Sequence, residues 1–343
     1  MSMKAYVGTG AQGAAHFAKK SLDMDNKLPL GSLDLSGEIC DLRLRGIGKS
    51  YGEFALQSVS LDVPRGSIVG LVGRNGAGKT TLMKIALGCV KSDSGSVELF
   101  GKTRDNLSGT ELTALKARIG YVSSVCAYPL QMSVAQVATM YSLAYPKLDY
   151  QLLENLLERM GLLKSNPKPH RSYAARKKVG ELSRGMGMKL QLACVLACGA
   201  DLLVMDEPTA GLDPIVRDEV LDILRECMGD GTKSILISSH ITSDLEHIAD
   251  YIVMLEEGKI AFASDCDRIY DEMGVAHLRG EELEHLLASG YIPAGQIRIV
   301  KRDFSWDVLV PNRAQFERNF PNFAIDKATI DETMTLVAKG ELR

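Results

Sequence analysis

The sequence predicts an α/β fold, in which a largely parallel β-sheet has helices on both faces and carries an antiparallel β subdomain and a lobe of inserted helices. Two observations support this prediction. Strands and helices alternate between residues 67 and 262, as they do around parallel sheets. A glycine-rich loop at residues 73–81 lies between an apolar strand and a helix, which is the setting of a phosphate-binding loop.

The N-terminal part of the chain divides into two segments. Residues 1–40 are rich in Gly, Ala, Ser and Asp and have no sustained hydrophobic period, so we expect a flexible extension there. From residue 41 apolar runs at 42–47, 59–63 and 68–72 are punctuated by Pro64, Gly66 and Gly73, which is typical of strands. The first two of these runs are expected to belong to the antiparallel subdomain.

The rest of the chain alternates up to residue 266 and then changes character. We predict helices at 79–89, 110–117, 184–199 and 214–228, and strands at 96–104, 119–122, 202–205, 234–238 and 251–262. Residues 133–161 are mostly helical, because leucines recur there at helical spacing, and they belong to a helical insert at about 124–184. Residues 267–343 have weaker periodicity and are expected to form a small accessory α+β domain that ends with a helix near 331–339.

Composition excludes several classes of protein. The chain has 343 residues, of which 45% are hydrophobic and 24% charged, so it is globular and not disordered. No run reaches 18 uninterrupted apolar residues, and the N-terminus lacks an apolar signal segment. Seven cysteines at irregular spacings fit a reducing compartment and form no metal motif. The net charge of −3 disfavours nucleic acid as the main partner.

The loop at residues 73–81 meets the separate demands of a bound nucleoside triphosphate. Glycines let the backbone wrap closely, so that successive N–H groups point at phosphate oxygens. The helix that follows adds its positive N-terminal end. Lys79 is expected to reach the β and γ phosphates, and the Thr80 hydroxyl to bind Mg²⁺. The residues expected to hold ATP are Gly73, Asn75, Gly76, Ala77, Gly78, Lys79, Thr80 and Thr81. The fold class is therefore a P-loop NTPase core.

Two carboxylates, Asp206 and Glu207, follow the apolar run at 202–205. Open α/β sheets bind their ligands at the carboxyl ends of the strands, where this pair is expected to lie. Asp206 is suited to hold the magnesium ion directly or through water. Glu207 is suited to accept a proton from an attacking water. A simple helix-capping Asp-Glu pair is the alternative interpretation.

Five motifs, taken together, resemble those of ABC transporter nucleotide-binding subunits. They appear in the order of that family at residues 73–81, 182–186, 206–208, 211–213 and 238–240, within the region 41–266. A narrower likeness is to the ATPase subunits of bacitracin- and lantibiotic-type exporters, which resemble this chain at 145–149, in the motif at 182–186 and in the tail at 330–340.

The resemblance assigns roles to further residues. It implies that Tyr51 stacks on adenine, although Tyr51 is also interpretable as an ordinary turn aromatic. Ser183 and Gly185 precede a helix and form a second anion site, which in this family faces the triphosphate of the opposite subunit. Asp213 resembles the loop residue that couples the two active sites. His240 resembles the side chain that touches the γ phosphate and orients the attacking water.

Two positions depart from the family pattern. The family has Gln where Ser124 follows residues 119–123. Serine is too short to contact both the magnesium site and a partner, so a water substitutes, or Gln131 folds back, or the subunit senses nucleotide weakly. Met186 stands where many members have Gln, and a thioether is a poor acceptor. Because Lys79, Asp206 and Glu207 remain, we expect hydrolysis to survive.

The predicted function is that of the ATP-hydrolysing subunit of an ABC transporter, of exporter type. We expect a head-to-tail dimer, of identical or sibling subunits, that binds ATP and Mg²⁺ at the cytoplasmic face of the membrane. It would drive a separate membrane subunit through residues 124–150. The alternatives are a soluble ABC-type ATPase and a weakly hydrolysing ATP-binding switch. The basic stretch 164–178 is interpretable as a contact for anionic lipid or an acidic partner, or as a solvated loop.

Overall fold

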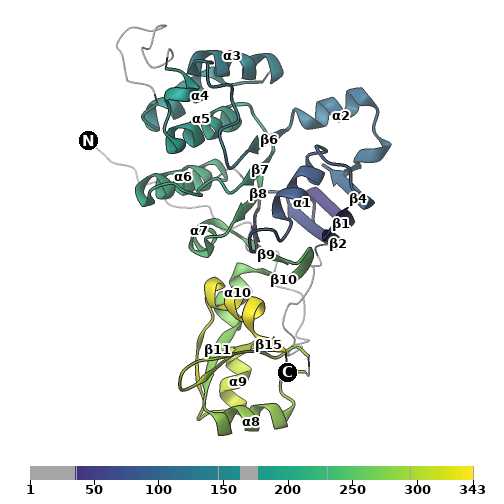
Figure 1. Cartoon of the computed structure of the whole chain (residues 1–343), viewed down its shortest axis with the longest axis vertical. Helices are drawn as coiled ribbons and strands as arrows, with labels where there is room; N and C mark the ends of the chain where they lie inside the picture. Colours follow the sequence, from purple (N-terminus) through teal and green to yellow (C-terminus); the bar gives the residue numbers. More distant parts are fainter. Residues whose placement is uncertain are drawn as a thin grey trace, which may run out of the picture.

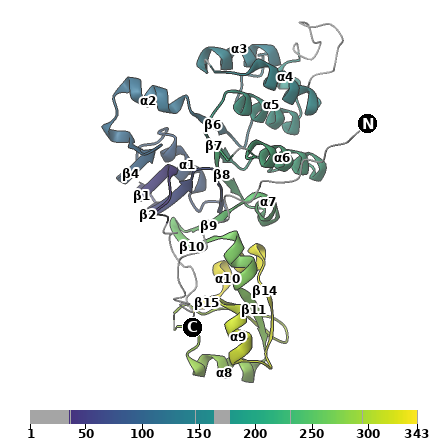
Figure 2. The same ribbon diagram turned by 180° about the vertical axis from the view of Figure 1, so that it is seen from behind.

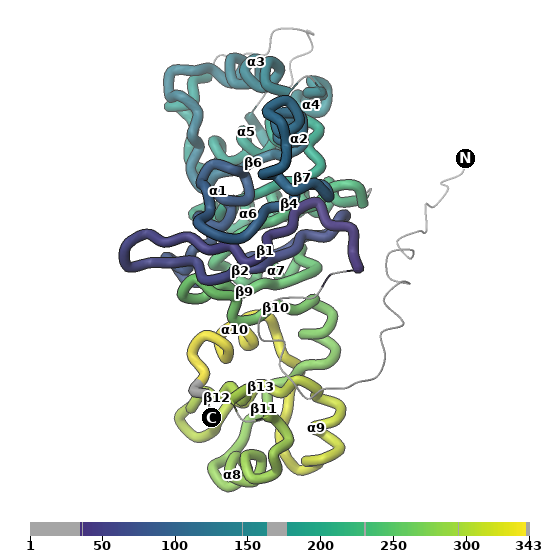
Figure 3. Tube along the Cα trace, turned by 90° about the vertical axis from the view of Figure 1, so that its right-hand side faces the viewer, coloured from purple at the N-terminus to yellow at the C-terminus, as the bar shows by residue number. Residues whose placement is uncertain are grey.

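A computed structural model describes residues 35, 37–145, 147–162, 177–229, 231–293 and 295–342 of the chain. Almost all of the predicted N-terminal extension and of the basic stretch 164–178 lies outside the described residues. The rest of the chain forms three stacked parts, in which a helical lobe and a C-terminal unit lie at opposite ends of a central β region (Figure 1). Figure 3 shows the same order from the side.

A six-stranded sheet forms the centre of the molecule, with strand order β10-β9-β3-β8-β7-β6. The five strands from β9 to β6 run parallel, and only β10 is antiparallel to its neighbour. Every residue of β3, β7 and β8 is buried, as expected for parallel strands covered on both faces. The strand bounds are β3 (Ile68–Val72), β6 (Ile119–Val122), β7 (Leu202–Asp206), β8 (Ser234–Ser239), β9 (Tyr251–Glu256) and β10 (Lys259–Asp265).

An antiparallel sheet of order β2-β1-β4-β5 packs beside the central one, as predicted. Its long hairpin brings Tyr51 opposite Phe54 at the turn. The strands are β1 (Cys40–Tyr51), β2 (Phe54–Pro64), β4 (Ser94–Leu99) and β5 (Lys102–Thr103). The helical segments of this region are α1 (Lys79–Ala86), η2 (Arg104–Asn106) and α2 (Gly109–Lys116).

Alternate side chains of the central strands enter two different cores. Val69, Leu71 and Val204 pack with α1 and the antiparallel sheet, whereas Ile68, Leu203 and Met205 pack on the opposite face. The second face is covered by α5 (Arg184–Ala197), α6 (Pro214–Cys227) and α7 (Thr242–Ile248), as Figure 2 shows from behind. The sheet is thus sandwiched between helices, and the predicted α/β fold class is confirmed.

The helical lobe contains α3 (Val134–Ala144), α4 (Tyr150–Arg159) and the short 3₁₀ turn η4 (Val179–Glu181), and packs on α5. The helix starts follow from the sequence. Ser133 accepts a hydrogen bond from the Gln136 N–H while the Gln136 side chain accepts one from the Ser133 N–H, which is a capping box. Asp149 accepts from the Leu152 N–H and starts α4.

The C-terminal unit, residues 267–342, has a β-α-β-β-α-β core followed by one more helix and a short strand. Its antiparallel sheet has the order β14-β11-β13-β12-β15, which is a split βαβ arrangement of the ferredoxin-like kind. The elements are η5 (Arg268–Glu272), β11 (Gly274–Leu278), α8 (Gly280–Ser289), β12 (Arg298–Lys301), β13 (Trp306–Val310), α9 (Arg313–Asn319), β14 (Ala324–Lys327), α10 (Ile330–Lys339) and β15 (Glu341–Leu342).

The predicted strands and helices of the first 265 residues are found within a few residues of their expected positions. One α-helix of this region, α7, has seven residues and was not predicted. It is too short to display a hydrophobic period, since its seven residues cover only two turns.

Candidate functional site

The glycine-rich loop wraps the start of α1 in a conformation that only glycine accommodates at several positions. Gly78 is the N-cap of α1 and has φ +108°. Gly73 has φ +155°, and a Cβ there would lie 2.2 Å from the Leu255 carbonyl oxygen. The loop therefore presents backbone N–H groups at the positive end of a helix, as phosphate binding requires.

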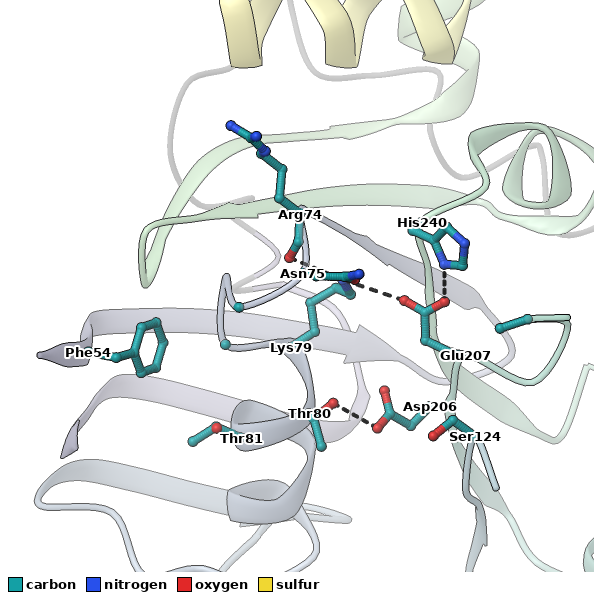
Figure 4. A pocket seen from close by; sticks show the side chains of 13 residues that line it. Phe54, Arg74, Asn75, Lys79, Thr80, Thr81, Ser124, Asp206, Glu207 and His240 are labelled. Carbon is teal, nitrogen blue, oxygen red and sulfur yellow. Dashed lines mark hydrogen bonds and ion pairs between the residues drawn. The ribbon is translucent and has the colours of Figure 1, made fainter. Parts of the chain in front are cut away.

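Lys79 lies within this loop, with 6% of its surface exposed. Its ammonium group donates a hydrogen bond of 2.6 Å to the Gly73 carbonyl oxygen, and it lies 3.5 Å from Glu207 Oε1. A buried ammonium between these acceptors is held over the cavity, within reach of an anion that enters it (Figure 4).

Asp206 ends the buried strand β7 and has 4% of its surface exposed. Thr80 Oγ1 donates a hydrogen bond of 2.8 Å to one carboxylate oxygen, and Ser238 Oγ donates one of 2.8 Å to the other. The carboxylate and the Thr80 hydroxyl are the hard oxygen ligands that Mg²⁺ prefers. In the described part of the chain no group of three His, Cys, Asp or Glu side chains could hold a metal. The Asp206 carboxylate and the Thr80 hydroxyl together fit an ion such as Mg²⁺, which takes few protein ligands and completes its coordination shell with phosphate and water.

Glu207 follows Asp206 with φ +53°, in the left-handed region that costs a non-glycine residue energy. Its backbone N–H donates to Ser238, at 3.0 Å to Oγ and 3.2 Å to the carbonyl oxygen. Its carboxylate pairs with Nδ1 of His240 (Figure 4). The turn therefore directs Glu207 across the mouth of the cavity toward Lys79 and His240.

The pairing of β7 with β8 brings these distant residues together. Asp206 is the register partner of Ser238 in the parallel ladder, so His240 emerges two residues later beside Glu207. Burial, and to a lesser extent the negative charge of Asp206, raises the pKa of Tyr121 on the adjacent strand β6. Tyr121 is thus partly buried near Asp206, although it does not itself line the cavity.

The resulting cavity has a volume of about 580 Å³. Among its lining residues are the predicted site residues Asn75, Gly76, Gly78, Lys79, Thr80, Thr81, Asp206, Glu207 and His240. Sequence reasoning did not select three others, Arg74, Ala210 and Phe54. Ala77 is buried behind the loop, and Gly73 faces a neighbouring cavity.

The aromatic residue that lines the cavity is Phe54, whereas Tyr51 was expected from the sequence. Tyr51 is 47% exposed and does not line the cavity, and Lys49 Nζ lies 5.5 Å from the centre of its ring. Phe54 lines the cavity instead, with its ring edge 2.7 Å from the position of a Cβ on Gly78. The signal was available in the sequence, because Phe54 is the next aromatic after Tyr51 across the tight hairpin turn. Adenine stacking by Tyr51 stays a prediction.

Three further predicted site residues form a separate surface, which we call the signature patch: Ser183, Gly185 and Asp213. Ser183 is the N-cap of α5 and Asp213 the N-cap of α6. A Cβ on Gly185 would lie 3.6 Å from Leu212, so the two helix starts are adjacent. None of the three lines the cavity of the same chain. The patch is thus a separate surface, outside the cavity that the phosphate loop lines.

The two positions that depart from the family pattern have clear surroundings. Ser124 lines the cavity, whereas Gln131 is exposed and lies outside its lining. The Met186 sulfur accepts a long hydrogen bond of 3.7 Å from Lys177 Nζ, and the Met186 N–H donates to Ser183 Oγ at 3.2 Å.

Comparison with known proteins gives consistent results. Residues 56–210 match the family model for ABC transporters. The lantibiotic transport ATP-binding protein SrtF of Streptococcus pyogenes is 33% identical over 227 residues, which are 66% of this chain and 91% of that protein. The bacitracin transport ATP-binding protein BcrA of Enterococcus faecalis is 32% identical over 294 residues, 81% of this chain and 89% of that protein.

Solved structures support the fold. The structure of an ATP-binding subunit of an ABC transporter superposes with a TM-score of 0.57 at 23% identity and covers 72% of this chain and 98% of that one. A dimeric ATP-binding cassette in a post-hydrolysis state with ADP and Pi has a TM-score of 0.57 at 21% identity and covers 65% of this chain and 98% of that one. Within the residues that the structure describes, no helix is long and apolar enough to cross a bilayer.

Proposed function

Because the chain belongs to the family of ABC transporter ATPases, we propose that its central cavity binds and hydrolyses MgATP to drive a separate membrane subunit. One observation carries this proposal: the phosphate loop, Asp206, Glu207 and His240 line a single cavity although they come from three distant parts of the chain. This combination supplies phosphate binding, metal ligation and a base in one place.

The proposed roles follow from the contacts. The loop N–H groups and Lys79 bind the triphosphate. Thr80 and Asp206 would hold Mg²⁺, which when bound would supply neutralisation of triphosphate charge. Glu207 accepts the proton of the attacking water. His240 pairs with the Glu207 carboxylate at the mouth of the cavity, where it would orient that water and contact the γ phosphate.

The direct test is the variant Glu207→Gln, which keeps the shape of the side chain and removes its basicity. We expect ATP affinity to be retained and turnover to fall by about a hundredfold or more, the usual loss of a general base. Glu158→Gln, an exposed carboxylate change on α4, is the matched control and should leave turnover unchanged. Steady-state ATPase activity of Glu207→Gln equal to that of wild type would overturn the role of Glu207.

We further propose that two ATPase subunits, identical or sibling, close head to tail around two nucleotides. The signature patch supports this, since its helix starts offer an anion site that does not reach this chain's own cavity. Glu207→Gln should elute as a monomer without nucleotide and as a dimer with MgATP in size-exclusion chromatography. A chain that stays monomeric at saturating MgATP requires a sibling subunit; if dimers form equally when Ser183 is replaced by Arg, the patch has no role in closure.

The membrane subunit is proposed to dock on residues 124–150, and the chain to serve an exporter at the cytoplasmic face of the membrane. Exposed apolar side chains support the docking surface, namely Val125, Leu130, Met140 and Leu143. The relatives SrtF and BcrA are named for lantibiotic transport and bacitracin transport, which supports a transport role for this chain. Leu143→Asp should abolish co-purification of the membrane subunit. The matched control Phe304→Asp, at a still more exposed apolar position in the C-terminal unit, should not.

A weakly hydrolysing switch is the second candidate, and one observation favours it: Ser124 lines the cavity where the family has a longer amide side chain. A single-turnover measurement of phosphate release at saturating ATP separates the two. Negligible release would support the switch, and complete release within one turnover would support the ATPase.

A further inference from the structure

The last long helix of the chain, α10, packs on the catalytic core and not only on its own unit. Met334, Leu336 and Val337 of α10 enter the same hydrophobic core as Leu245 of α7 and Met254 of β9. The C-terminal unit is therefore not a loosely tethered module. Helix α10 shares a core with β8 and α7, which come before and after His240 in the chain, and with β9.

The contact between α10 and α7 is also polar and specific. Thr242, the first residue of α7, donates a hydrogen bond of 2.6 Å to Asp331 Oδ1 in the first turn of α10. The Asp331 N–H in turn donates to Glu246 Oε1 at 3.4 Å. Thr242 and Glu246 are four residues apart and so lie on one face of α7. Asp331 thus bridges one full turn of that helix.

This contact lies two residues from His240, which belongs to the segment 239–241 at the end of β8 that we call the His240 loop. His240 is connected to Thr242 through Ile241, whose N–H and carbonyl oxygen are both bonded to Ser239 Oγ. The N-cap position of α7, Ile241, has no side-chain cap of its own. The start of α7, and with it the direction in which His240 leaves the strand, is therefore held by Ser239 on one side and by Asp331 on the other.

A second cavity, of about 640 Å³, separates α10 from the phosphate loop. It shares Arg74, Asn75 and His240 with the nucleotide cavity, and Met334 and Lys339 of α10 line its other side. The yellow ribbon at the top of Figure 4 is this part of the chain, toward which Arg74 points. Thr242 and Asp331 line this cavity too, and their hydrogen bond is a direct polar link between α10 and the residue two positions after His240.

We propose that Asp331 is a positioning residue: through Thr242 it holds the His240 loop in its catalytic orientation, so that turnover depends on the docking of the C-terminal unit. This inference rests on the proposed ATPase function of the cavity. It makes the C-terminal unit a control element for hydrolysis, because any partner or ligand that displaces α10 would release His240 from its place beside Glu207.

The test compares Asp331→Ala, Thr242→Val and Thr242→Ser in the full-length protein. An exposed hydrogen bond of this kind corresponds to about a two- to tenfold change in an equilibrium or rate. We expect Asp331→Ala and Thr242→Val to lower kcat by that factor with little change in KM for ATP, and Thr242→Ser, which keeps the hydroxyl, to restore kcat. Asp326→Ala, a largely exposed carboxylate in the same unit, is the matched control and should behave as wild type.

Two combinations make the test decisive. The double variant Asp331→Ala/Thr242→Val should lose no more kcat than either single variant, because both remove one contact. In a His240→Ala background, Asp331→Ala should cause no further loss in single-turnover hydrolysis, since the positioned side chain is gone. Additive losses, or an unchanged kcat in Asp331→Ala, would overturn the inference. Wild-type protein without ATPase activity would instead overturn the proposed function on which it rests.

Discussion

Ser238 forms hydrogen bonds with both acidic residues of the site, Asp206 and Glu207. The effect of Ser238→Ala on the free energy of unfolding can therefore be estimated from defined contacts. The Ser238 side chain is fully buried, donates to Asp206 at 2.8 Å and accepts from the Glu207 N–H at 3.0 Å. In Ser238→Ala the Asp206 carboxylate keeps only the Thr80 hydroxyl. The Glu207 N–H keeps the Ser238 carbonyl oxygen at 3.2 Å, so the loss falls mainly on Asp206.

The magnitude follows from these contacts. A hydrogen bond to a charged group contributes about 1.5–3 kcal/mol, and leaving a buried acceptor short of a donor costs the upper part of that range. We therefore expect the free energy of unfolding to fall by about 2–3 kcal/mol. For a domain of this size that corresponds to a decrease in Tm on the order of 4–10 °C.

Ser239→Ala provides the matched control for the assay. Ser239 is the next residue and equally buried, but its hydroxyl contacts only the backbone of Ile241, so its loss should cost about 0.5–1.5 kcal/mol. Urea denaturation followed by circular dichroism gives both values. We also expect Ser238→Ala to raise the Mg²⁺ concentration needed for half-maximal ATPase activity. A Ser238→Ala protein as stable as Ser239→Ala would refute the reasoning.

Two further predictions concern nucleotide affinity and acid stability. If Phe54 and not Tyr51 stacks on adenine, Phe54→Ala should weaken ATP binding by about 1–3 kcal/mol in a fluorescence titration. Tyr51→Ala should then leave ATP binding unchanged. A loss of affinity in Tyr51→Ala alone would instead support the assignment made from the sequence. In the C-terminal unit, burial acts to raise the pKa of Asp307, but hydrogen bonds from Arg302 and His277 outweigh it and lower that pKa. The pKa of Asp307 is lower in the folded state than in the unfolded state, so its ionised carboxylate stabilises the fold. This contribution to the free energy of unfolding is complete above the ordinary carboxyl pKa of about 3.9, and it is lost as the pH falls through the lowered value. Asp307→Asn should therefore be less stable than wild type at neutral pH, and the difference in urea midpoint should shrink below about pH 4; a difference that grows in acid would contradict this.

Contacts within short stretches of chain were the part that the sequence predicted well. The loop at residues 73–81 depends on glycine conformations and on the helix that starts beside it, so its residue types suffice to identify it. The same holds for Asp206 and Glu207, since an apolar run that ends in carboxylates indicates a buried strand whose tip faces a ligand. The central strands were likewise recognisable because parallel strands buried on both faces are apolar throughout.

Contacts between distant segments were decided by the tertiary structure alone. The register of β7 with β8 gives Asp206 and Glu207 their common partner Ser238 and brings His240 to Glu207. The docking of α10 likewise links Asp331 to Thr242. No local pattern encodes these pairs, because they depend on which strands become neighbours and on where a helix finds an apolar surface. The sequence by itself thus determined the chemical groups of the site, and packing determined which of them meet.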